Sequence, residues 1–313
     1  MNTETPVLLL SFNRNDTVKQ VFEAIAREKP KRLYLASDGP RAEVAGEAEN
    51  VLAVRKYLLD NVSWNCEVKT LFRDKNLGCK YAVSKALSWF FENEEMGIIL
   101  EDDCYPSHGF FGFCTELLEK YKYDKNIGMI SGRNELGVYK PESGYFVTSR
   151  GFIWGWATWR RAYSGFNVEI GGHNTRINTL QLLLRSTSMV EFLYRWLCVK
   201  MIVNKQVNSW GYPWGLYLLL NKYKSIIPSC NLIKNIGGGN NATHTKMLVD
   251  SIALYDIDLP VAKGMVVREE REFVVQTIIG GRGIRRYVQY VMLTLYRLFF
   301  KKNLSRAVKL IAM

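Results

Sequence analysis

Three adjacent carboxylates, Glu101, Asp102 and Asp103, directly follow the apolar residues 98–100. We refer to these three side chains as the carboxylate cluster. Neighbouring carboxylates repel one another and lose solvation when they are buried, so we expect a cation to hold them. Mg²⁺ or Mn²⁺ commonly binds through one or two carboxylates while substrate phosphates complete its coordination, and we expect Asp103 to contact such an ion. The alternatives are a solvated turn, or a role of Asp102 as the cap of a helix that starts near Pro106.

Strand and helix patterns alternate from residue 7 to residue 131. Such alternation is typical of a parallel sheet, so we predict an α/β fold, Rossmann-like, with a mostly parallel sheet covered by helices on both faces. Ligands of these sheets bind beyond the carboxyl ends of the strands, where the carboxylate cluster lies. The predicted strands are 7–12, 32–37, 66–72, 96–100 and 127–131. The first predicted helix starts after Asn15 or Asp16, and the next three cover about 42–60, 78–93 and 107–122.

The composition describes an ordinary globular chain, because 313 residues with 48% hydrophobic content can bury one large domain or two smaller ones. Six cysteines without a C-x-x-C pair argue against a zinc ribbon or a secreted disulfide scaffold, so we expect reduced thiols. The apolar residues 7–10 lack the flanks of a secretory signal, which predicts a cytoplasmic protein.

The segment 281–313 is strongly basic: it has eight Lys and Arg residues and no acid, and so supplies +8 of the net charge of +12. Its uncharged run, 287–296, is too short to span a bilayer, which needs about 20 residues. Apolar residues at helical spacing beside basic ones are typical of an amphipathic helix at an anionic membrane, and we expect peripheral binding at the inner face. The alternative is a helix folded onto the body. We do not expect a nucleic-acid partner, because a recognition motif is lacking.

The stretch "IILEDDCYPSHGFFGF" resembles the acidic D-x-D-type motif of GT-A fold glycosyltransferases, in particular the N-acetylglucosaminyltransferase I-like and family 2-like forms. "PVLLLSFNR", "YLASDGP" and "FRDKNLGCKYAVSKALSWFF" occur in the order that this fold uses, so the resemblance covers about residues 6–135. It implies a GT-A domain over residues 1–280, with the donor-binding half at about 1–135 and the acceptor half at about 136–280.

The resemblance also implies roles for single residues. Arg14 would lie near the donor diphosphate, and Asp38 would accept a hydrogen bond from uracil or another base. Glu101 and Asp102 would face the ribose and the sugar, and Asp103 would bind the metal. Two alternatives come from the local sequence: Asp38 starts the turn sequence "DGP", and Arg14 can pair with the nearby Asp16.

Further candidates lie at a helix start and in polar or aromatic stretches. Arg73 and Asn76 precede a predicted helix, whose first amides favour a phosphate, although Asn76 can equally be an ordinary cap. His244 follows "IGGGNN", and the resemblance implies that it is a metal ligand. Trp156, in "WGWATWRR", has a ring that can stack on a sugar, although core packing explains a tryptophan equally well.

An inverting transfer needs a base near the anomeric carbon, usually Asp or Glu. The resembling enzymes carry an acid in a tryptophan-flanked segment, whereas "NSWGYPWG" has Gly211 there. We therefore expect Glu135 to be the base, or inversion is in doubt.

The sequence thus predicts a Mn²⁺- or Mg²⁺-dependent hexosyl- or N-acetylhexosaminyltransferase of polysaccharide biosynthesis. It would move a sugar from a nucleotide-sugar, expected to be a UDP-sugar, to a glycan or lipid-linked acceptor. The alternatives are a non-catalytic protein that binds nucleotide-sugars or glycans and, ranked lower, a sugar-phosphate nucleotidyltransferase. The nucleotidyltransferase is ranked lower because "SFNRND" stands where a glycine-rich basic loop is expected.

Overall fold

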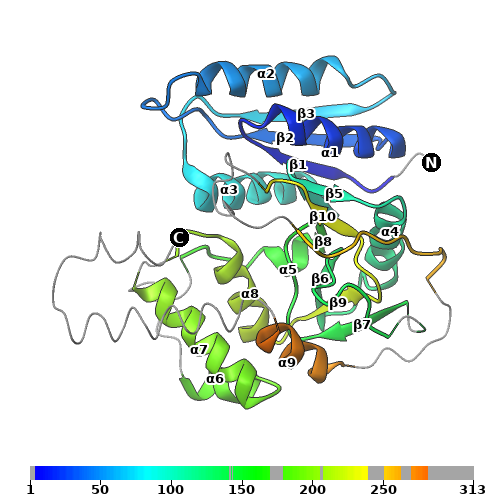
Figure 1. Cartoon of the computed structure of the whole chain (residues 1–313), viewed down its shortest axis with the longest axis vertical. Coiled ribbons are helices and arrows are strands. Elements are labelled where there is room, and N and C mark those ends of the chain that lie inside the picture. The colour runs from blue at the N-terminus through cyan, green and yellow to red at the C-terminus, as the bar shows by residue number, and fades with distance from the viewer. Residues whose placement is uncertain are drawn as a thin grey trace.

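The computed structural model describes residues 4–140, 142, 144–169, 179–204, 207–238, 250–261 and 269–280. Within these ranges, eight strands form one sheet in the order β3-β2-β1-β4-β8-β6-β9-β7 (Figure 1). Four neighbouring pairs are parallel, whereas β8 runs antiparallel to β4 and β6, and β7 runs antiparallel to β9. This mostly parallel α/β sheet confirms the predicted fold class. Its strands are β1 (Val7–Ser11), β2 (Arg32–Ser37), β3 (Glu67–Phe72), β4 (Met96–Glu101), β6 (Ile127–Ser131), β7 (Tyr145–Thr148), β8 (Trp156–Trp159) and β9 (Lys224–Pro228).

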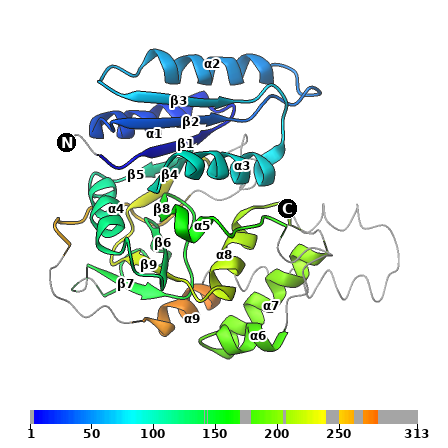
Figure 2. The same cartoon turned by 180° about the vertical axis from the view of Figure 1, so that it is seen from behind.

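Helices cover both faces of the sheet, because alternate residues of its buried strands point to opposite sides. Val7 and Leu9 of β1 pack with one set of helices, and Leu8 and Leu10 pack with the other. Figures 1 and 2 show the two layers from opposite sides. The first layer is α1 (Asn15–Glu28), α2 (Glu47–Asp60) and α4 (Gly109–Lys120), and the second is α3 (Gly78–Asn93), α5 (Arg160–Tyr163) and α8 (Gly211–Leu220).

The five predicted strands and four predicted helices all occur, with small shifts at their ends. The largest shift is at α2, which begins at Glu47 after Gly46, a residue with a φ of 76°. A left-handed residue cannot continue a right-handed helix, so the helix starts later than its sequence pattern indicates. A short strand, β5 (Cys104–Pro106), separates the carboxylate cluster from α4.

The second half of the chain completes the sheet and adds a group of helices at one end. Its strands β7, β8 and β9 belong to the same sheet as β1–β4. Helix α7 (Met189–Val203) packs against α6 (Thr179–Arg185), α8 and α9 (Arg271–Ile279). In Figure 1 these helices lie below the carboxyl ends of the first strands.

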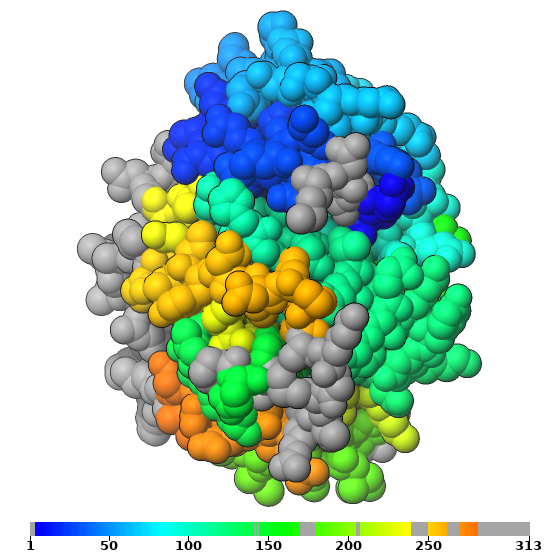
Figure 3. Space-filling model, turned by 90° about the vertical axis from the view of Figure 1, so that its right-hand side faces the viewer, coloured from blue at the N-terminus to red at the C-terminus, as the bar shows by residue number. Residues whose placement is uncertain are grey.

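A late segment of the chain returns to the carboxylate cluster. Strand β10 (Ile233–Asn235) pairs antiparallel with β5, and Ile236 N donates to the Asp103 backbone oxygen (2.8 Å). Residues 250–261 then cross the surface beside α4, where Asp256 Oδ1 accepts from Gly109 N (2.6 Å); this segment is yellow-orange in Figure 3. These contacts hold the segment after β9 at the edge where ligands of parallel sheets bind.

Among the described residues, no helix is long and apolar enough to cross a membrane. The predicted amphipathic tail, 281–313, lies outside those residues, so its membrane affinity stays a prediction.

Candidate functional site

A cavity of about 700 Å³ lies at the carboxyl ends of β1, β2 and β4. One part of its wall comes from residues at and just after these strand ends, and the other part comes from residues 150–154, α7 and α8. Seven residues predicted for the site line this cavity together: Arg14, Asp38, Asn76, Glu101, Asp102, Asp103 and Glu135. Their placement is as expected, and their individual roles stay predictions.

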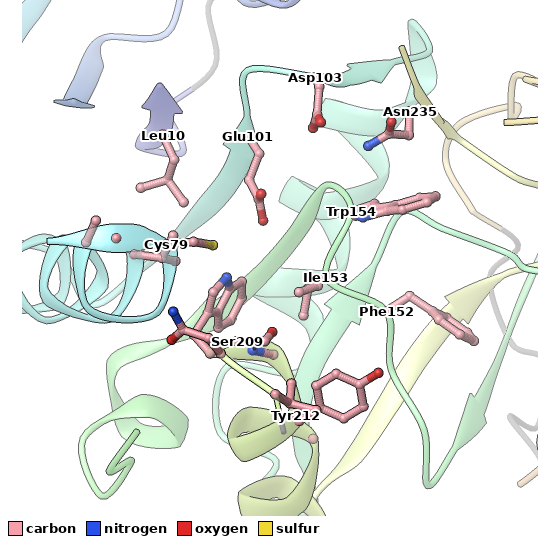
Figure 4. A pocket seen from close by; sticks show the side chains of 18 of the residues that line it. Leu10, Cys79, Glu101, Asp103, Phe152, Ile153, Trp154, Ser209, Tyr212 and Asn235 are labelled. Carbon is pink, nitrogen blue, oxygen red and sulfur yellow. Dashed lines mark hydrogen bonds between the residues drawn. The ribbon is translucent and has the colours of Figure 1, made fainter. Parts of the chain in front are cut away.

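The members of the carboxylate cluster have three different environments. Asp102 is buried, and its Oδ2 accepts a hydrogen bond from Phe12 N (3.0 Å). Asp103 Oδ2 accepts from Arg14 Nη1 (2.8 Å). Glu101 points into the cavity beside Leu10 and Cys79 (Figure 4), and no described residue donates a hydrogen bond to its carboxylate. The cluster therefore offers the cavity one carboxylate without a donor and one that is held by an arginine.

Burial and mutual repulsion disfavour the charged form of these acids. Burial, followed by the charges of Asp103 and Asp102, raises the pKa of Glu101 to about 8. Burial and the charge of Asp103 raise the pKa of Asp102 to about 7. The same causes raise the pKa of the Cys79 thiol to about 12, so this thiol is neutral at neutral pH and is not an activated nucleophile. A cation placed among these groups would relieve the repulsion.

The raised pKa values predict that the metal-free protein loses stability as pH rises. A carboxyl group with a raised pKa binds more protons in the folded state than in the unfolded state, so its ionisation opposes folding from about pH 4.5 up to the raised pKa. We expect Glu101→Gln to reduce the fall in Tm between pH 5 and pH 8 by a few degrees, since solvent in the cavity screens part of the effect. Thermal unfolding in EDTA measures this, and identical pH profiles for the two proteins would contradict it.

Arg14 pairs with Asp103, which is 89 residues away, and not with Asp16 as the local alternative predicts. A Cβ atom on Gly237 would lie 2.4 Å from Asp103 Oδ2 and 2.5 Å from Arg14 Nη1. A side chain at position 237 would therefore displace this ion pair, which is consistent with glycine at this point of the sequence after β10.

The carboxylate of Asp38 holds the start of α3. It accepts hydrogen bonds from Leu77 N (3.0 Å to Oδ2) and from Gly78 N (3.0 Å). Because amides at a helix start carry partial positive charge, the carboxylate stabilises this turn. Asp38 also lines the cavity. If it bound a nucleotide base as predicted, the same carboxylate would both accept from the base and hold the start of α3.

Arg73 does not line the cavity, which corrects the expectation that it faces a phosphate there. Its backbone carbonyl accepts from Arg55 Nη2 (2.6 Å), and its N–H donates to the Ser37 carbonyl (3.1 Å), so it supports the β2 end. Asn76 does line the cavity, and its Nδ2 donates to the Gly39 carbonyl (2.7 Å).

Trp156 is completely buried in the core, where it packs against Trp210 and Trp214, so it cannot stack on a sugar in the cavity. This placement corrects the expectation for Trp156. Trp154 lines the cavity instead, and the guanidinium of Arg133 lies over its ring at 4.9 Å.

Glu135 lines the cavity, with its side chain 28% exposed. Arg133 Nε lies 3.6 Å from Glu135 Oε1, while the other nitrogens of Arg133 form a buried pair with Asp250 (2.6 and 2.8 Å). Gly211, where the resembling enzymes carry an acid, also lines the cavity, and a Cβ there would lie 2.6 Å from Ile153 Cδ1. A larger residue at position 211 would therefore displace the end of the Ile153 side chain, and the role of Glu135 as the base stays a prediction.

A divalent ion would find few protein ligands here. Within the part of the chain that the structure describes, no three His, Cys, Asp or Glu side chains group together to hold a metal. The fit is therefore to an ion held by one or two carboxylates, Asp103 first, together with phosphate oxygens of a substrate. His244 lies outside the described residues, so its role as a ligand stays a prediction.

The structure adds residues to the site that the sequence patterns did not single out. Cys79 and Asn235 lie near the carboxylate cluster (Figure 4), and Arg41, Arg150 and Arg195 also line the cavity. Arg41 follows a predicted strand end and Cys79 lies in the first turn of a predicted helix, so both positions were an available signal. Asn235, Arg150 and Arg195 come from β10, a loop and α7 of the second half, where no sequence pattern marked a strand end.

No protein-family model matches the chain, and a search of curated proteins finds no match either. Among solved structures, HddC from Yersinia pseudotuberculosis is 13% identical with a TM-score of 0.28, over 41% of this chain and 57% of that chain. The inositol-1-phosphate CTP transferase from T. maritima is 13% identical with a TM-score of 0.33, over 52% and 74%. UDP-glucose pyrophosphorylase complexed with UDP-glucose is 8% identical with a TM-score of 0.37, over 75% and 94%. This low likeness carries no argument about reaction or substrate, so the fold class of this chain rests on its own sheet.

Proposed function

We propose that the chain is a nucleotide-sugar-dependent glycosyltransferase. The observation that carries the proposal is the single cavity that joins an acidic end, at the carboxyl ends of β1, β2 and β4, to an aromatic end from the second half of the chain. The acidic end suits a metal and a nucleoside diphosphate, because carboxylates can hold the ion and Arg14 can reach a phosphate. The aromatic end suits a sugar or an acceptor, because rings stack on apolar sugar faces.

In the proposed reaction, an acceptor hydroxyl oxygen bonds to the anomeric carbon while the bond from that carbon to the diphosphate breaks. The acceptor proton passes to Glu135, and the nucleoside diphosphate leaves with the bonding electron pair. A bound divalent ion would neutralise charge on the leaving diphosphate. Arg14, which pairs with Asp103 in this structure, has a guanidinium that can pair with a phosphate oxygen instead.

A sugar-phosphate nucleotidyltransferase is the second candidate, because it would use the same edge of the sheet. Its nucleoside triphosphate would need a loop with several anion-binding groups after β1. Here only residues 12–14 separate β1 from α1, and Arg14 is the one basic side chain among them. This short connection favours a diphosphate donor over a triphosphate substrate.

A panel of nucleotide-sugars, tested with and without Mn²⁺, checks the proposal. We expect one UDP-sugar to raise the Tm only with Mn²⁺, because a ligand at 100 times its Kd stabilises the native state by about 2.7 kcal/mol. We also expect slow release of UDP from that donor, as water replaces the acceptor. Pyrophosphate release from a nucleoside triphosphate and a sugar phosphate would favour the nucleotidyltransferase. Binding without any turnover would favour the non-catalytic alternative.

A further inference from the structure

The end of the cavity away from the carboxylate cluster contains an arginine that has no carboxylate partner among the residues that the structure describes. Of the four arginines that line the cavity in the described residues, Arg14, Arg41 and Arg195 pair with Asp103, Glu47 and Glu191, respectively. Arg150 forms no ion pair within the described ranges, and these ranges contain every Asp and Glu of the sequence.

The surroundings of Arg150 hold its guanidinium in one orientation. The rings of Phe152 and Tyr194 lie 5.0 and 4.9 Å from its central carbon, and Nη1 donates to Thr277 Oγ1 (3.0 Å). Rings near the faces of a guanidinium leave its edge for hydrogen bonding. That edge carries N–H groups in the fork that matches a phosphate or a carboxylate.

The lining of the cavity from the second half of the chain includes the apolar side chains Ile153, Met201, Val207 and Leu216. Among the described residues, the acids that line the cavity are Glu135 and those near the carboxylate cluster, Asp38, Glu101, Asp102 and Asp103. Figure 4 shows Phe152 and Tyr212 on the side opposite Leu10, away from Glu101 and Asp103. A half-buried cation in such surroundings lacks both full hydration and a counter-charge, so a bound anion would stabilise it.

We propose that Arg150 binds an anionic group, a phosphate or a carboxylate, on the acceptor substrate. This inference rests on the proposed glycosyltransferase function and narrows the acceptor to a molecule that carries an anion next to an apolar portion. The phosphates of the nucleotide-sugar donor could also bind an arginine, but Arg14 and the carboxylate cluster at the opposite end already provide a site for them.

Inorganic phosphate is the probe for this site, and it is titrated by calorimetry while UDP and Mn²⁺ are saturating. Because the donor site is then filled, we expect phosphate to bind still, and Arg150→Gln to weaken its binding about 10-fold or more, as expected for the loss of a charge-assisted bidentate contact of about 1.5–3 kcal/mol. Lys200→Gln, which removes an exposed cation of α7 outside the cavity, should leave the affinity unchanged.

Thr277→Val is a second variant, in case Arg150→Gln fails to fold. Thr277→Val keeps the charge of Arg150 but removes the hydroxyl that orients the guanidinium, so it should weaken phosphate binding less than Arg150→Gln does. The affinity for UDP should be unchanged in both variants. Equal phosphate affinity in wild type and Arg150→Gln, or competition between phosphate and UDP, would overturn the assignment to the acceptor. If wild type binds phosphate through Arg150 but binds no nucleotide at all, the proposed function fails while the anion site stands.

Discussion

Asp103→Asn is expected to remove the Mn²⁺ dependence of UDP binding while the fold stays intact. Changes in groups that merely orient metal ligands cost 10–100-fold in affinity, so loss of a direct carboxylate ligand should cost about 100-fold or more. Asparagine keeps the shape of the side chain but loses its charge. The substitution also releases Arg14 from its ion pair, so weak metal-independent binding of UDP should persist or improve.

Calorimetric titration of UDP with and without Mn²⁺ measures this effect. Asp16→Asn is the matched control, because Asp16 is an exposed acid in the first turn of α1 and its substitution removes the same charge. We expect the control to bind UDP and Mn²⁺ as wild type does. An unchanged Mn²⁺-dependent affinity in Asp103→Asn would show that Asp103 is not a metal ligand.

Glu135→Gln is expected to lower sugar transfer by about 10²–10⁴-fold, which is the range for loss of a general base. Donor binding should not change, because in the proposed reaction Glu135 takes the acceptor proton, and it does not lie at the ends of β1, β2 or β4. The contact with Arg133 Nε (3.6 Å) is long, so its loss should leave the buried Arg133–Asp250 pair intact.

Rates of donor turnover, together with UDP affinity, separate these effects. Glu119→Gln, on the exposed side of α4, removes the same charge outside the cavity and should retain full activity. Transfer at the wild-type rate in Glu135→Gln would show that the base is another residue, or that the reaction proceeds with retention and needs none.

Local patterns were sufficient to predict the first half of the sheet. Strands such as β1 and β4 are continuous apolar runs and the helices between them have regular apolar spacing, so each pattern spans only neighbours in sequence. The position of the carboxylate cluster at the end of β4 follows from the same alternation. Strands β7, β8 and β10 of the second half were not predicted, because they have only three or four residues. The aromatic residues of β7 and β8 also suit a core strand or a buried helix equally well.

Tertiary structure decided which side chains share the cavity. Trp154 and Trp156 are two residues apart and would face the same side of a regular strand. Gly155, with a φ of 57°, turns the chain between them, so Trp156 enters the core and Trp154 lines the cavity. A side chain at position 155 would also collide with Ile233, since its Cβ would lie 2.3 Å from Ile233 Cδ1.

The sequence by itself therefore determined the α/β alternation and the strand end that carries the acids, because both depend on short-range periodicity. Only the tertiary structure decided that Arg14 pairs with Asp103, that Asp38 holds the start of α3, and that Arg150 has no carboxylate partner within the described ranges. These contacts join segments tens of residues apart, and the free energy of each depends on burial and on competing partners that no local pattern records.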